Sequence, residues 1–119
     1  MLGDASSFSK TMIVCGYTDL RKGIDGLASI VYDSFGQTPF EPKVLFLFCG
    51  RRTDRIKGLI WEGDGFLLLY KRLEKGVFQW PRSKNEVLNL TNQQYRWLME
   101  GLSIEQKKVI QHTYPQKIA

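Results

Sequence analysis

The sequence is poor in the residues that build metal sites and disulfide frameworks. Its 119 residues include only two cysteines, Cys15 and Cys49, and one histidine, His112. Two distant cysteines cannot supply the four ligands of a structural zinc site. Two buried free thiols in a reducing cytoplasm are therefore expected, with a single disulfide as the alternative. His112 lies near the C-terminus without a nucleophile and carboxylate spaced to serve it, so a catalytic triad is unsupported.

Long apolar runs and nucleotide-binding motifs are also missing. The longest apolar run, residues 44–49, has six residues and the run over residues 66–70 has five, whereas a membrane helix needs roughly 20 residues. No secretion signal is recognisable at the N-terminus, so a cytoplasmic location is expected. The chain has neither a P-loop nor a GxGxxG fingerprint. We therefore expect no cofactor, metal, membrane contact or small-molecule substrate, and nothing specifies an enzyme.

Basic charge, by contrast, is present in excess and is unevenly distributed. The chain has 17 Lys and Arg against 12 Asp and Glu, a net charge of +5. Residues 51–84 hold nine of these bases and four of these acids, so nine minus four places the whole excess of +5 in this segment. Such segregation indicates a polyanionic partner, usually a nucleic acid, although a solvated basic surface has the same composition.

The hydrophobic pattern predicts one α+β domain over residues 11–102, preceded by a flexible N-terminus over residues 1–10. Short β-rich runs joined by glycine turns predict an antiparallel meander of four to five strands, with two main helices packed against it. The strands are expected at residues 11–15, 43–49, 55–61, 66–73 and 77–81. Residues 103–119 are expected to form a short helix and a mobile tail.

The two main helices have recognisable ends. Apolar residues at spacings of three and four predict the first helix up to residue 35, with Thr18 or Asp19 as N-cap and Gly36 at its end. The second begins at "LTNQQYRWLMEGL", where Thr91 and Gln94 are typical of a capping box.

Two glycines inside the first predicted helix need an explanation. Gly23 and Gly26 each cost a helix about 1 kcal/mol relative to alanine. They make sense if another backbone, from the sheet or from a partner, packs close to them. With the flanking Arg21, Lys22 and Asp25, they form the expected partner-binding surface.

The stretch "EGDG" at residues 62–65 carries Glu62 and Asp64 on either side of a glycine. Paired carboxylates can bind a metal, but the neighbouring sequence supplies no further ligand. Gly and Asp are favoured in turns because they tolerate positive φ. The stretch therefore predicts a hairpin turn, and a small nuclease that uses both acids is the weaker alternative.

Basic and aromatic residues alternate after residue 50. "GRRTDR" places three arginines on a loop before a strand, where guanidinium groups can bind phosphates. Trp61, Tyr70, Phe78 and Trp80 are expected on the same sheet. Exposed aromatics among basic residues can stack bases, whereas buried ones form a core, and a core position is favoured for Trp61 and Phe78. The predicted nucleic-acid-binding residues are Arg51, Arg52, Arg55, Lys57, Lys71, Arg72, Arg82 and Lys84.

Three stretches, "TDLRKGIDGLA", "FLFCGRRTDRIKGLIWEGDGFLLLYKRLEKGVFQWP" and "LTNQQYRWLMEGL", together resemble the TnpB accessory proteins of the insertion sequence 66 family, from about Val14 to Leu102. Arg21, Lys22 and the three loop arginines match basic positions of that family, whereas Cys49 and Gly50 depart from its pattern. The matching positions include no established catalytic residue.

The resemblance implies a non-catalytic accessory role in the transposition of a bacterial mobile element, beside a separate and larger transposase. The expected partners are DNA at the element ends and transposase subunits of the same element. The alternative is a protein-interaction module without direct DNA contact, whose basic segment meets an acidic partner surface.

Overall fold

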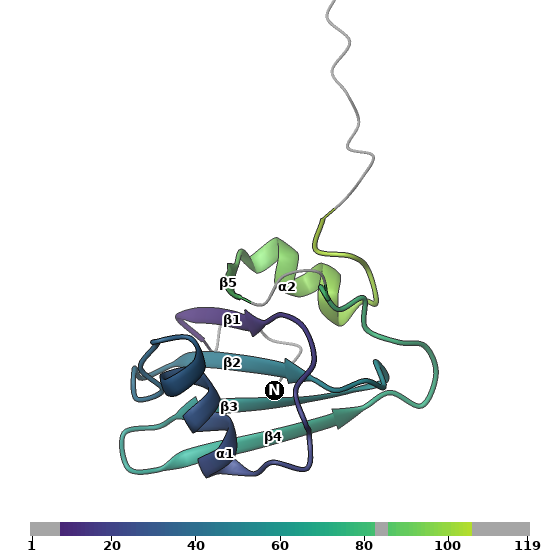
Figure 1. Ribbon diagram of the computed structural model, residues 1–119. Helices are drawn as coiled ribbons and strands as arrows, with labels where there is room; N and C mark the ends of the chain where they lie inside the picture. The colour runs from purple at the N-terminus through teal and green to yellow at the C-terminus, as the bar shows by residue number, and fades with distance from the viewer. Residues whose placement is uncertain (1–7, 83–85, 106–119) are drawn as a thin grey trace, which may run out of the picture.

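The computed structural model describes residues 8–82 and 86–105, which form an open sheet with a helix against each face (Figure 1). The five strands lie in the order β4-β3-β2-β1-β5. Their bounds are Lys10–Val14 for β1, Val44–Cys49 for β2, Arg55–Trp61 for β3, Phe66–Arg72 for β4 and Val87–Leu90 for β5. The predicted α+β fold is confirmed.

The sheet combines a meander with one parallel pair. Strands β2, β3 and β4 are antiparallel neighbours, as predicted. Strand β1, however, runs parallel to β2 and antiparallel to β5, so the expectation of a purely antiparallel sheet is wrong at this pair. Parallel neighbours need a crossover connection, and the first helix lies in the chain between β1 and β2.

The strand predicted for residues 77–81 is wrong, and the fifth strand is β5 instead. Phe78 and Trp80 do alternate with exposed neighbours, and their exposed fractions are only 1% and 6%. The Phe78 N–H donates to the Thr53 carbonyl at 2.7 Å, but residues 77–81 form no ladder of strand hydrogen bonds. Pro81 has no N–H to continue one, so the segment is extended chain that closes the core.

The first helix begins later than predicted. Helix α1 covers Ile24–Ser29 with Gly23 as its N-cap, and a π-helical segment, η2, continues over Ile30–Ser34. The Thr18 N–H donates instead to the Cys49 carbonyl at 2.9 Å, which holds residues 17–20 beside the end of β2. A cap at Thr18 or Asp19 is therefore wrong. Gly36 has φ of +65° just beyond η2, as a helix-ending glycine should.

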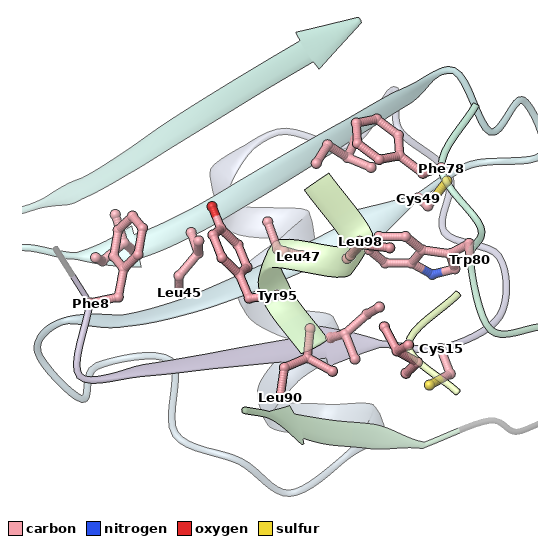
Figure 2. Packing of buried hydrophobic residues seen from close by; sticks show 14 residues of the cluster. Phe8, Cys15, Leu45, Leu47, Cys49, Phe78, Trp80, Leu90, Tyr95 and Leu98 are labelled. Carbon is pink, nitrogen blue, oxygen red and sulfur yellow. The ribbon is translucent and has the colours of Figure 1, made fainter. Parts of the chain in front are cut away.

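Strand alternation divides the core into two clusters. In β2, which is buried throughout, Leu45, Leu47 and Cys49 belong to one cluster and Phe46 and Phe48 to the other. Helix α2, Asn92–Met99, covers the first cluster together with Phe78, Trp80 and Ile104 (Figure 2). Helix α1 covers the second cluster on the opposite face.

Helix α2 has the predicted capping box. The Gln94 N–H donates to Thr91 Oγ1 at 3.0 Å, and the Thr91 N–H donates to Gln94 Oε1 at 2.9 Å. Leu90 and Tyr95, on either side of the cap, are both buried in the first cluster. The local sequence therefore fixes where this helix starts.

The ends of the described chain are packed against the core. Strand β1 begins at Lys10, and Phe8 before it is buried. Residues 103–105 are non-helical, with Ile104 buried, and the rest of the expected C-terminal helix lies outside the described residues. Within the described ranges, no helix is long and apolar enough to cross a membrane.

The two glycines near α1 are not approached by another backbone. A Cβ at Gly23 would meet nothing within 4 Å, and one at Gly26 would lie 3.0 Å from Lys22 Cβ. The Lys22 carbonyl is itself held by Lys57 Nζ at 3.1 Å. The close neighbour of Gly26 is therefore a side chain of the same segment.

We expect Gly26→Ala to stabilise the protein by less than the roughly 1 kcal/mol that alanine gains over glycine in a free helix. The reason is the contact with Lys22. Urea unfolding measures the difference, with Ser29→Ala at an exposed position of the same helix as control. A full gain at Gly26 would show that Lys22 moves aside at no cost.

Candidate nucleic-acid interface

An open groove lies between the segment after β1, the loop after β2 and the β3–β4 hairpin. Its volume is about 990 Å³, and we call it the basic groove. Five cationic side chains and one carboxylate line it. The lining residues are Tyr17, Thr18, Asp19, Leu20, Arg21, Gly50, Arg51, Arg52, Arg55, Lys57, Leu68 and Tyr70. The groove thus joins part of the predicted partner-binding segment to the predicted phosphate-binding loop.

Gly50 permits the two loops to meet. A Cβ at this position would lie 3.3 Å from Leu20 Cγ and 3.4 Å from the Thr18 carbonyl oxygen. The first distance is tighter than an ordinary side-chain contact, and the second is at the lower limit of one. Gly50 is therefore a position at which the walls of the groove come together.

Arg82 links the segment after β1 to the loop after β2 through hydrogen bonds. Its guanidinium donates to the Gly16 carbonyl at 2.9 Å and to the Gly50 carbonyl, and it lies 4.1 Å from the centroid of the Tyr17 ring. Arg82 was predicted to bind nucleic acid; in the structure two of its N–H groups donate to backbone carbonyls, which leaves only its remaining N–H groups for that predicted contact. Its principal contribution is to hold the walls of the groove together.

Cys49, the last residue of β2, is a buried cysteine with a free thiol. Burial raises the pKa of its thiol to about 11, although the nearby Arg82 acts in the opposite direction. The protonated thiol contacts the Arg55 carbonyl at 3.4 Å. Cys15 is also a buried thiol, so the predicted disulfide alternative is wrong.

Two of the groove arginines are paired with carboxylates one or two positions before them in sequence. Asp19 binds Arg21 with an Oδ2–Nη2 distance of 2.9 Å, and this bond lowers the pKa of Asp19 to about 2. Asp54 binds Arg55 Nε at 2.8 Å, which likewise lowers the pKa of Asp54. Both carboxylates therefore stay charged at neutral pH and offset part of the positive charge.

Three cations of the groove are less compensated. Arg52 reaches Asp54 only at 3.9 Å, and its side chain is 74% exposed. Arg51 lies 5.1 Å from the centroid of the Tyr17 ring, and Lys57 binds the Lys22 carbonyl. In the part of the chain that the structure describes, neither Arg51 nor Lys57 forms an ion pair. These three cations have donors available to an anionic ligand.

The hairpin extends the positive surface on one face only. Arg72 lies directly across from Arg55, and Tyr70 directly across from Lys57, so all four share the face toward α1. Arg72 has a long ion pair with Glu74 at 3.9 Å. Lys71 projects from the opposite face and does not join the groove, and Lys84 lies outside the described residues.

The predicted partner-binding surface only partly overlaps the groove. Arg21 lines it, whereas Lys22, Gly23 and Asp25 are exposed beside it. Gly26 is half-buried beneath the Lys22 side chain. The structure therefore places an exposed segment of mixed charge next to the cationic groove.

"EGDG" is the turn of the β3–β4 hairpin. The Glu62 N–H donates to the Gly65 carbonyl at 2.8 Å, and Gly63 has φ of +91°. Both acids are exposed at the opposite end of the hairpin from the arginine loop. Among residues 8–82 and 86–105, no three His, Cys, Asp or Glu side chains are grouped to hold a metal ion.

The aromatic predictions have mixed outcomes. Phe78 is buried as expected, and Trp80 is buried too, which removes both from any exposed stacking surface. Trp61 is half-buried and packs with Phe40 and Phe66 near the "EGDG" turn. Tyr70 is 54% exposed and lines the groove.

Tyr17 is the residue that the sequence did not single out. It is 61% exposed and has the Arg51 and Arg82 guanidiniums near its ring. Its only sequence signal is its place after Gly16, which has φ of +82° and turns the chain out of β1. Arg82 is 65 positions away, so no local pattern reveals the contact.

The fold and the groove define a small α+β protein with an open sheet and a cationic cleft beside one sheet face. This chain belongs to the family of IS66 Orf2-like proteins, whose family model matches residues 9–109. Membership confirms the resemblance seen in the sequence and makes this a transposition-associated accessory protein.

Two relatives from Sinorhizobium fredii (strain NBRC 101917 / NGR234) are similar to most of the chain. The uncharacterized protein y4jC is 29% identical over 110 residues, covering 92% of this chain and 93% of its own. The uncharacterized protein y4hO is 31% identical over 93 residues, covering 78% and 80%. No solved structure matches the chain.

Proposed function

We propose that this protein is a non-catalytic accessory factor that contacts DNA through the basic groove during transposition. The observation that carries the proposal is the convergence of Arg51, Arg52 and Lys57 in one groove without close carboxylate partners among the described residues. Guanidinium and ammonium groups in this state are suited to phosphate oxygens. The setting in transposition follows from the family.

Cross-strand repulsion also favours an anionic ligand. Arg55 and Arg72 lie directly opposite each other on β3 and β4. Like charges at such positions destabilise a sheet. Asp54 and Glu74 relieve this only in part, since the Glu74 contact is long and exposed. A phosphate bound between the Arg55 and Arg72 guanidinium groups would offset the remaining repulsion.

The position of the carboxylates supports a role without catalysis. Glu62 and Asp64 lie at the far end of the hairpin from the groove. Asp19 and Asp54 lie at the groove but are held by Arg21 and Arg55. The acids near the proposed DNA path are thus engaged in ion pairs.

A transposase subunit is the proposed protein partner, at the exposed surface of Lys22, Gly23 and Asp25. This surface adjoins the groove through the bond between Lys57 and the Lys22 carbonyl. A partner docked there would lie beside DNA in the groove. The competing function is an interaction module in which an acidic partner surface fills the groove itself.

Binding to element-end DNA and to random DNA, measured at several salt concentrations, tests the proposal. We expect Arg51→Ala/Arg52→Ala/Lys57→Ala to weaken binding to both DNAs about tenfold or more. The slope of log K against log salt should become shallower by nearly one for each phosphate contact removed.

The matched control is Lys10→Ala/Arg96→Ala/Lys71→Ala, which removes the same charge outside the groove. Equal losses in the two triple variants would show that only net charge matters. If the wild-type protein binds no DNA but its groove is protected by the transposase, the interaction module is correct.

A further inference from the structure

We infer that the basic groove receives single-stranded DNA, with unpaired bases stacked on Tyr17 and Tyr70. The inference rests on the proposed function, because it specifies which form of DNA the groove accepts. Two exposed aromatic rings within one cationic groove are the observation behind it. Single-strand binding sites combine such rings with a basic path for the backbone.

The backbone on either side of Tyr17 is held by hydrogen bonds, so the position of its exposed ring is restricted. Thr18, the next residue, is buried, and its N–H is fixed to the Cys49 carbonyl. The Gly16 carbonyl on the other side is bound by Arg82, whose guanidinium also packs near the ring. The backbone is thus held on both sides of a ring that remains 61% exposed.

Tyr70 supplies the second ring from the sheet. It is 54% exposed on β4, directly across from Lys57. Its pairing with Lys57 in the β3–β4 ladder fixes the backbone from which the ring projects.

The apolar part of the groove points to bases as well as phosphates. Leu20 and Leu68 line it together with the two rings, while the arginines and Lys57 supply the charge. Phosphate oxygens gain nothing from apolar neighbours, but the flat faces of bases do. In a duplex those faces are stacked inside and only base edges and phosphates are offered to a protein. The composition therefore favours unpaired nucleotides.

Exposure alone does not place a tyrosine in the groove. Tyr32 is 65% exposed on η2, yet it does not line the groove. Tyr32 therefore provides a matched control for the tyrosines of the groove.

Fluorescence anisotropy at fixed salt tests the inference with three probes of equal length, about 12 nucleotides. They are an oligothymidine strand, a strand of abasic sites with the same phosphates, and a duplex. We expect oligothymidine to bind about tenfold or more tightly than either other probe. Equal binding of oligothymidine and abasic strand, or tighter binding of the duplex, would overturn the inference and leave the proposed DNA contact intact.

Variants then locate the stacking. Tyr17→Leu/Tyr70→Leu should lower oligothymidine affinity to that of the abasic strand, and the loss should be far larger for oligothymidine than for the abasic strand or the duplex. Tyr17→Phe should retain affinity because the ring remains, and Tyr32→Leu should have no effect. A double variant that is folded by circular dichroism and still prefers oligothymidine would exclude these rings. Failure of the wild-type protein to bind any probe would overturn the proposed function as well.

Discussion

Replacing Arg82 by methionine is expected to lower the free energy of unfolding by roughly 2–4 kcal/mol. The guanidinium donates to the Gly16 and Gly50 carbonyls, and hydrogen bonds from charged donors are the stronger ones. Methionine keeps much of the aliphatic stem but leaves both carbonyls without this donor. Arg82→Lys should have about half the effect, because an ammonium cannot span both acceptors as a planar fork does.

Urea unfolding gives the measurement, and Arg51→Met is the matched control. Arg51 is exposed, and its guanidinium lies 5.1 Å from the centroid of the Tyr17 ring, so its loss should change stability by less than about 0.5 kcal/mol. The two variants should separate stability from DNA binding, with Arg51→Met affecting mainly the latter. Equal and small stability changes would show that Arg82 does not fasten the loops.

Local patterns predicted the elements whose stability is decided locally. The Thr91 and Gln94 capping box fixed the start of α2, and the turn residues of "EGDG" fixed the β3–β4 hairpin. The buried run of β2 was recognisable because its central position makes both faces apolar. In each case the residues that determine the element lie within the element itself or directly beside it.

Elements that depend on distant partners were predicted less well. Phe78 and Trp80 alternate like strand residues, but whether a ladder forms depends on neighbours elsewhere in the chain. The brief run of β5 becomes a strand because β1 offers it an edge. The Thr18 N–H is captured by β2 rather than by a helix, which a helical period cannot reveal.

The candidate site shows the same division. Charge counting found the arginine loop and Lys57, because their segment is basic in sequence. Charge counting could not place Lys71 on the opposite face of the sheet, because that depends on strand register. Nor could it show that Arg82 binds backbone carbonyls, because that depends on how the loops pack. Tyr17 was missed because its cationic neighbours come from two distant segments.

Replacing Trp80 by alanine is expected to have the largest effect on stability, about 3–5 kcal/mol. The side chain is only 6% exposed, lies in the cluster under α2, and donates from Nε1 to the Val14 carbonyl at 3.0 Å (Figure 2). Alanine would leave a large cavity and remove this bond. Trp80→Phe should cost less, roughly 1–3 kcal/mol, mainly because the buried carbonyl loses its donor.

The effect should reach the groove, because Trp80 anchors the chain two residues before Arg82. Once Trp80 is removed, Arg82 is less firmly placed to bind the Gly16 and Gly50 carbonyls. Trp61→Ala is the matched control, since that indole packs with Phe40 and Phe66 near the far end of the hairpin. With affinities corrected for the folded fraction from urea unfolding, Trp80→Ala should weaken oligothymidine binding several-fold and Trp61→Ala should not. If both variants bind alike, the core anchor and the groove are independent, and the loops are held by Arg82 without help from Trp80.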